Sequence, residues 1–88
     1  MIPAKHLYLY LVTQSANREY DTYDAFVVCA ENAEEAKHTH PTGEPLTPEW
    51  RPDIYDPWTS LENVHVQYLG KADPILTKGI LCASYNAG

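Results

Sequence analysis

The sequence has little of what phosphate-binding, metal-binding and membrane-spanning proteins require. Its four glycines, at positions 43, 70, 79 and 88, are scattered, so they form no glycine-rich loop that could cradle a phosphate. No C-x-x-C pair occurs, and no apolar run exceeds six residues, whereas a membrane-spanning helix needs about 20. We therefore expect no cofactor, no bound metal and no membrane segment.

Cysteine is also scarce, since only Cys29 and Cys82 are present and both lie inside apolar segments. One disulfide is conceivable, but two cysteines make no dense framework and no secretory signal precedes them. Free cysteine is among the most buried residue types. We expect two reduced thiols in the core of a cytoplasmic protein.

Basic residues are few and unevenly distributed. The chain has 6 Lys and Arg against 12 Asp and Glu, a net charge of −6. Residues 19–62 hold eleven of the acids and only two bases, a net charge of −9, whereas the rest of the chain is net positive. This balance argues against direct binding of a nucleic-acid backbone and favours a basic protein partner. An ordinary solvated acidic face is the alternative.

The hydrophobic pattern predicts a single small α+β domain of 88 residues. Strands are expected at residues 6–13, 24/25–30, 64–69 and 79–85, where apolar residues alternate or run continuously. The short spacing of the first two strands favours an antiparallel hairpin. The predicted fold is a four-stranded, mostly antiparallel sheet with one short helix packed on it.

The helix is predicted between the second strand and Pro41. Asn32 is suited to cap its first turn, with Glu35 able to reach back toward the cap, and Pro41 prevents continuation. About two turns remain, and only Ala33 and Ala36 can pack against a sheet. We expect the helix backbone to lie close to the sheet.

Residues 42–63 form a proline-rich connection, with four prolines between positions 45 and 57. Loops of about 20 residues are uncommon in compact domains and are usually functional or disordered. Trp50, Tyr55 and Trp58 argue against simple disorder, because such rings normally bury against something. Two interpretations remain open for them, packing in the core and contact with a partner, and a small-molecule or metal site in this loop is a further alternative.

An acidic, tyrosine-rich stretch precedes the second strand. Asp21 and Asp24 have a D-x-x-D spacing that lacks the other ligands and the glycine of a calcium loop. They could hydrogen-bond the backbone of a turn, or serve a recognition surface together with neighbouring tyrosines. We predict a partner-binding surface made of Glu19, Tyr20, Asp21, Tyr23, Asp24, Trp50, Tyr55 and Trp58.

The remaining chemistry-bearing residues predict neither a metal site nor an enzyme. His38 and His40 form an H-x-H pair, but zinc needs three or four converging ligands, so a histidine at a helix carboxyl end explains them better. Ser60 and Ser84 have no nucleophile elbow around them. No catalytic residue is predicted.

The segments YDTYDAFVVCAENAEEAKHTHP, VHVQYLGKAD and SYNAG resemble small phage and prophage proteins with the form Y-D-x-x-D-x-x-V-V-x-A-x-x-x-x-E-A. The resemblance covers about residues 12–88 and its motifs carry no known chemistry. It implies a compact protein acting in the bacterial host cytoplasm. Small acidic proteins of that kind are often inhibitors of host defences, including anti-CRISPR proteins, that occupy a basic nucleic-acid-binding surface.

The sequence therefore predicts a non-catalytic interaction protein, with an inhibitor of a bacterial nucleic-acid-acting defence system as the specific hypothesis. A structural phage subunit held together by exposed strand edges is a further alternative, and a homo-oligomer is compatible with either.

Overall fold

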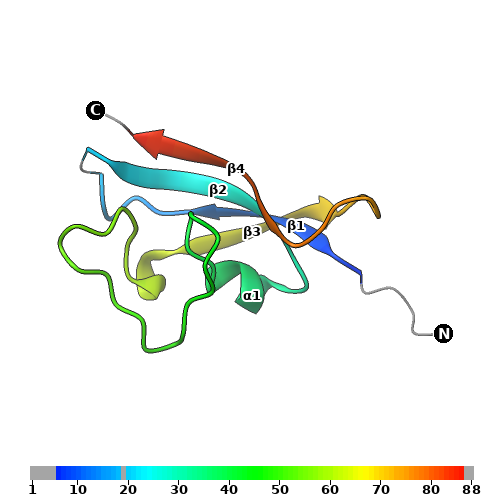
Figure 1. The fold of residues 1–88 in the computed structure, drawn as a ribbon, viewed down its shortest axis with the longest axis horizontal. Coiled ribbons are helices and arrows are strands. Elements are labelled where there is room, and N and C mark those ends of the chain that lie inside the picture. The colour runs from blue at the N-terminus through cyan, green and yellow to red at the C-terminus, as the bar shows by residue number, and fades with distance from the viewer. Residues whose placement is uncertain (1–5, 19, 87–88) are drawn as a thin grey trace.

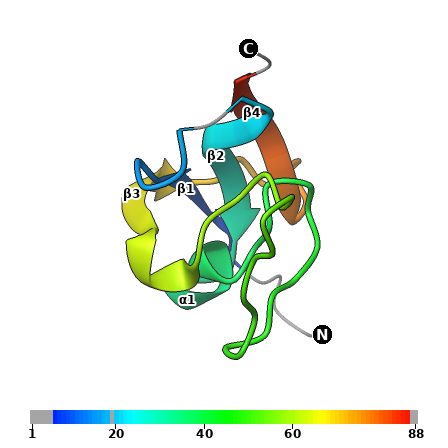
Figure 2. The ribbon, with the colours of Figure 1, turned by 90° about the vertical axis from the view of Figure 1, so that its left-hand side faces the viewer.

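The computed structural model describes residues 6–18 and 20–86. Four strands form one antiparallel sheet in the order β3-β1-β2-β4. One short helix, α1, and the connection that follows it lie on the same side of this sheet (Figure 1 and Figure 2). The predicted α+β class and the antiparallel sheet are confirmed. The elements are β1 (Tyr8–Thr13), β2 (Thr22–Ala30), α1 (Ala33–Lys37), the 3-10 helix η1 (Leu61–Asn63), β3 (His65–Lys71) and β4 (Gly79–Asn86).

The predicted hairpin is the centre of the sheet, since β1 and β2 pair directly and are flanked by β3 and β4. Val12 pairs with Phe26, and both side chains are fully buried on the covered face. Trp58, from the long connection, packs on Phe26 with 5.3 Å between ring centroids. The core therefore lies between the hairpin and the segment that crosses over it.

The second strand begins earlier than predicted, at Thr22 rather than at position 24 or 25. Thr22 pairs with Asn86 and Tyr23 with Tyr85, so the end of β4 extends the sheet into the polar stretch. Threonine and tyrosine both favour strands. Tyr23 and Asp24 therefore belong to the sheet, and only the residues before them form the turn.

Helix α1 begins as predicted. The Asn32 side chain accepts a hydrogen bond from the Glu35 N–H at 2.8 Å, and the Glu35 carboxylate accepts one from the Glu31 N–H at 3.0 Å. Ala36 is fully buried, whereas Ala33 is exposed, so one alanine rather than two packs on the sheet. In the part of the chain that the structure describes, no helix has the length and apolar character needed to cross a membrane.

The other face of the sheet is open, and this corrects the expectation for Cys82. Cys29 is buried, but Cys82 is exposed. Cys82 lies on β4, an outer strand of the sheet, beside Val27 and Leu11 at a shallow hollow of about 220 Å³. The apolar residues around Cys82 predicted burial, but an outer strand on an uncovered face leaves its side chains in solvent.

Candidate functional site

Two of the predicted segments, far apart in the sequence, meet at one hollow of about 210 Å³. Tyr20 and Asp21 form one side, and Ile54, Tyr55 and Asp56 form the other. The side chains of Tyr20, Ile54 and Tyr55 are among the most exposed large hydrophobic groups, at 73%, 89% and 87%. We call this region, together with the neighbouring Asp53, the acidic-aromatic surface.

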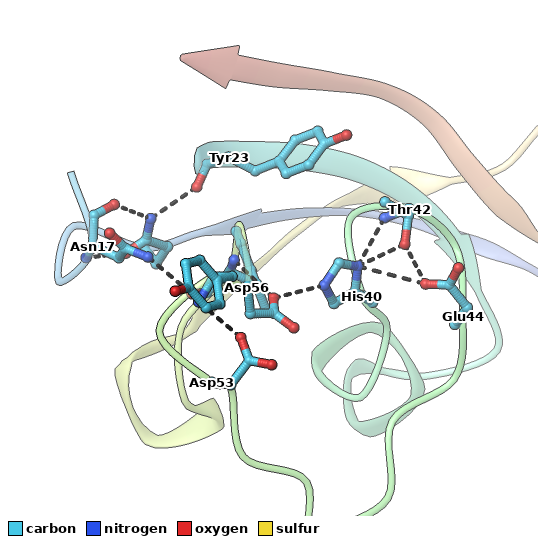
Figure 3. A network of polar contacts seen from close by, with 10 residues as sticks. Asn17, Tyr23, His40, Thr42, Glu44, Asp53 and Asp56 are labelled. Atoms are coloured by element: carbon cyan, nitrogen blue, oxygen red, sulfur yellow. Dashed lines mark hydrogen bonds and ion pairs between the residues drawn. The ribbon is translucent and has the colours of Figure 1, made fainter. Parts of the chain in front are cut away.

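The first side of the surface is held by a turn after β1. The Gln14 side-chain amide donates to the carbonyls of Asn17 (2.7 Å) and Tyr23 (2.8 Å), and the Asn17 N–H donates to the Gln14 side chain at 2.7 Å. The Asn17 side chain then donates to the Trp58 carbonyl at 3.1 Å (Figure 3). This network ties the turn that precedes Tyr20 to the long connection.

Asp21 closes this turn in a left-handed backbone conformation, with a φ of 62°. Its N–H donates to the Asn86 carbonyl at 2.6 Å, which ties the turn to the end of β4. Asp is one of the few non-glycine residues that tolerate this conformation. Partial desolvation, and then the nearby Asp21 carboxylate, raise the pKa of Tyr85, although this residue is 47% exposed. The turn therefore presents a carboxylate beside an uncharged phenol.

The second side of the surface is the tip of the long connection. The Asp53 carboxylate accepts the Tyr55 N–H at 2.8 Å, and the Asp53 carbonyl accepts the Asp56 N–H at 3.2 Å. This turn projects Ile54 and Tyr55 into solvent. The Tyr23 N–H, donated to the Pro57 carbonyl at 2.9 Å, attaches the tip to β2.

A buried histidine braces the tip against the start of the connection. His40 Nε2 lies 3.0 Å from Asp56 Oδ1, and the same oxygen accepts a hydrogen bond from the backbone N–H of Trp58 at 3.0 Å. The His40 side chain is only 10% exposed and that of Asp56 22%. The Asp56 carboxylate is therefore engaged in hydrogen bonds within the loop, whereas the side chains of Ile54 and Tyr55 are exposed and can contact a partner.

The other ring nitrogen of His40 faces Thr42 and Glu44. Thr42 Oγ1 lies 2.7 Å from His40 Nδ1, and the Thr42 hydroxyl donates to the Glu44 carboxylate (Figure 3). This hydrogen bond lowers the pKa of Glu44. The Thr42 hydroxyl therefore links His40 to Glu44 at the start of the long connection.

The two tryptophans do not lie on the acidic-aromatic surface. Trp58 is 1% exposed and belongs to the core, so its ring is not accessible to a partner. Trp50 is half-buried against the same core and meets His40 edge-on, with 5.9 Å between ring centroids. The loop aromatics were predicted either to pack in the core or to contact a partner. Trp58 packs in the core, whereas Tyr55 is exposed and is available for a partner.

The other predicted residues are separated from the hollow. The Tyr23 ring packs on Tyr85 with 4.8 Å between centroids. Asp24 is exposed at an irregularity in the pairing of β2 with β4, two residues beyond the hollow. Glu19 lies outside the described residues. The sequence pattern did not predict Ile54 as a surface residue. An isolated isoleucine between Asp53 and a tyrosine in a polar loop could have indicated an exposed contact residue.

The histidine pair does not converge on a metal site in the structure. His38 Nδ1 contacts the Glu34 carbonyl at 2.8 Å, whereas His40 is engaged by Thr42 and Asp56. Within residues 6–18 and 20–86, no three of the residue types that ligate metals come together.

A larger hollow of about 460 Å³ lies between α1, residues 43–46 and the start of β4. Its charged groups are paired with one another, since Lys78 Nζ lies 3.0 Å from Glu35 Oε2 and 3.4 Å from Glu31 Oε1. The hydrogen bond to Glu35 raises the pKa of Lys78. This hollow therefore offers a ligand few polar groups that are not already engaged, and the acidic-aromatic surface is the better candidate.

No protein-family model, no curated protein and no solved structure matches the chain.

Proposed function

We propose that this chain is a non-catalytic interaction protein that binds a basic protein partner through the acidic-aromatic surface. The observation that carries the proposal is the meeting of Tyr20, Ile54 and Tyr55, all highly exposed, among the carboxylates of Asp21 and Asp53. Large apolar side chains gathered at one exposed site are typical of binding surfaces.

The chemistry of this surface favours a basic partner. Tyrosine contributes contact area at a low entropic cost, and it is frequent at the centre of interfaces. Carboxylates around an apolar centre attract basic side chains and increase the association rate. Residues 19–62, which contain the whole surface, carry a net charge of −9, and this excess of acids also favours a basic partner.

The resemblance to small phage proteins supports a more specific partner, a nucleic-acid-acting defence protein in the host bacterial cytoplasm. Such proteins carry a basic surface that an acidic protein can occupy. The interaction would then compete with nucleic acid, without chemistry performed by this chain.

Capture from bacterial lysate with a matched pair of variants tests the proposal. Ile54→Asp places a charge at the apolar centre of the surface. Ile75→Asp makes the same change at an equally exposed isoleucine in the turn between β3 and β4. We expect the wild type and Ile75→Asp to retain the same stoichiometric partner and Ile54→Asp to lose it. Retention should also weaken as salt is added.

Equal retention by both variants would show that the partner binds elsewhere. A wild-type protein that retains nothing stoichiometric would count against an interaction function altogether.

A further inference from the structure

A hollow of about 320 Å³ lies at the end of the sheet where β1 begins and β3 ends (Figure 1). One wall comes from the start of β1, and the other comes from the end of β3 and the turn that leads to β4. This hollow is more enclosed than the shallow one beside Cys82. Its volume falls at the lower end of the range of about 300–1,000 Å³ that is typical of small-molecule sites.

Backbone hydrogen bonds hold the two walls in place. The Ala72 N–H donates to the Leu7 carbonyl at 2.9 Å, which joins the turn to the segment that leads into β1. Within the turn, the Asp73 carboxylate accepts a hydrogen bond from the Ile75 N–H at 2.9 Å, and the Asp73 carbonyl accepts one from the Leu76 N–H at 2.9 Å. The hollow is therefore formed by the fold itself, as small-molecule sites usually are.

The lining combines apolar side chains with an unpaired cation. Leu7, Ala72 and Leu76 are half-buried in the hollow, whereas the side chain of Lys71 is exposed at its edge. Among the described residues, no carboxylate lies within ion-pair distance of Lys71. The larger hollow beside α1 differs in this respect, because Lys78 is paired there with two carboxylates. The Lys71 ammonium is therefore available to an anionic ligand.

We propose that this hollow binds a small amphipathic anion, a molecule with a compact apolar body and one carboxylate. The apolar body would displace water from Leu7, Ala72 and Leu76, and the carboxylate would lie beside Lys71, with the His6 ring as a second donor. A cation would meet Lys71 without a free acid in compensation, because the Asp73 carboxylate is already engaged by the turn. The small volume favours a compact molecule over a peptide chain.

The site is separate from the acidic-aromatic surface. Tyr20 and Asp21 of that surface belong to the connection that follows β1, whereas the hollow adjoins the start of the same strand. The two sites also have opposite signs of available charge, so they select different ligands. The inference therefore does not depend on the proposed function.

The test is a titration of the full chain with octanoate, followed by the NMR shifts of the backbone amides. Two matched probes carry the same apolar chain, 1-octanol without a charge and octylammonium with the opposite charge. We expect saturable binding of octanoate with the largest shifts at residues 71–76, weaker binding of 1-octanol and the weakest binding of octylammonium.

Two pairs of variants assign the binding to the hollow. Leu76→Asp places a carboxylate in the apolar wall, whereas Ile75→Asp makes the same change at the neighbouring exposed residue, which does not line the hollow. We expect Leu76→Asp to raise the dissociation constant of octanoate about tenfold or more, and Ile75→Asp to change it much less. Lys71→Gln should raise it about two- to fivefold, the effect of one exposed ion pair, and Lys37→Gln on α1 is its control.

Thermal unfolding verifies that the variants fold, and Lys71→Gln keeps the test decisive if Leu76→Asp does not. A wild type that shows no saturable binding of octanoate up to about 10 mM overturns the proposal. So does octylammonium that binds as tightly as octanoate, or equal affinity of octanoate for Leu76→Asp and Ile75→Asp. Amide shifts confined to Leu11, Val27 and their neighbours would place octanoate on the uncovered face of the sheet, and would equally overturn the assignment to this hollow.

Discussion

His40 Nε2 lies 3.0 Å from Asp56 Oδ1, and this contact joins two points of the chain that are 16 residues apart. It closes the proline-rich connection at a place where the imidazole is almost completely buried. The same carboxylate accepts a hydrogen bond from the backbone N–H of Trp58, so a single side chain positions both the core tryptophan and the exposed tip of the loop. The candidate binding surface therefore depends on a brace that itself faces away from solvent.

Replacing Asp56 with alanine should destabilise the protein by about 1–3 kcal/mol, because it removes two hydrogen bonds and leaves a buried imidazole nitrogen without its acceptor. Asp53→Ala is the matched control, since it removes an exposed contact with the Tyr55 N–H in the same loop. We expect the control to change the free energy of unfolding much less. Urea denaturation measures the free energy of unfolding of both variants. An equal loss of stability in the two would show that the His40–Asp56 contact stabilises the fold no more than the exposed Asp53 contact does.

Glu44 should titrate at an unusually low pH. The Thr42 hydroxyl lowers the pKa of Glu44 below its ordinary value of 4.5. A carboxyl group whose pKa is lowered by folding stabilises the folded state above its unfolded pKa, and this contribution is lost as the pH falls through the folded pKa. Thr42→Val should therefore raise the pKa of Glu44 and weaken the dependence of stability on pH below about 4.5.

NMR titration of the Glu44 carboxyl carbon measures the first effect, and denaturation at several acidic pH values measures the second. Thr47→Val removes a hydroxyl from the same loop and should change neither. An unchanged Glu44 pKa in Thr42→Val would contradict the assigned cause.

Asp21 should tolerate few substitutions, because its φ of 62° lies in the left-handed region. Asp21→Asn should be nearly neutral for folding, whereas Asp21→Val should cost about 1–2 kcal/mol. Asp24→Val removes the same charge from an exposed strand position, where a β-branched residue fits, so it should cost little. Thermal unfolding of the three variants separates backbone strain from loss of charge, and similar costs at both positions would argue against strain.

The two thiols should react at very different rates in the folded protein. Cys82 is exposed, whereas Cys29 is buried and its burial raises the pKa of its thiol. A buried, uncharged thiol is a poor nucleophile. One thiol per folded chain should therefore react promptly with a maleimide, and both should react in denaturant. Peptide mapping after labelling would identify the site, and prompt labelling of Cys29 would contradict the structure.

The class of the fold and the position of each strand could be predicted because they depend on local patterns. Alternating apolar residues in 6–13 and the asparagine cap at Asn32 act over a few residues, and each appears in the structure in nearly the expected place. The end of the helix was predicted less well, because α1 ends at Lys37, before Pro41, and has five residues rather than about two turns. The ends of β2 and β3 shifted because strand ends depend on the neighbouring strand.

The candidate surface could be predicted only in part, because burial of a side chain is decided by what crosses over it. Trp50, Tyr55 and Trp58 lie within nine residues of one another and share a polar, proline-rich context, so nothing local distinguishes them. In the structure Trp58 reaches the core, Trp50 lies at its margin and Tyr55 projects into solvent. Cys82 was wrongly expected in the core for the same reason.

The acidic stretch before β2 shows which features follow from the sequence and which follow only from the folded structure. The sequence alone established that Glu19, Asp21 and Asp24 open a segment rich in carboxylates and that residues from 24 or 25 to 30 favour a strand. Only the folded chain brought Tyr20 and Asp21 beside Ile54 and Tyr55, more than thirty residues away, and turned Tyr23 toward Tyr85. Preferences for strand, turn or helix depend on neighbouring residues and can be predicted from the sequence. A surface made by two distant segments forms only in the folded chain, where the hydrogen bonds from Asn17 and Tyr23 join those segments.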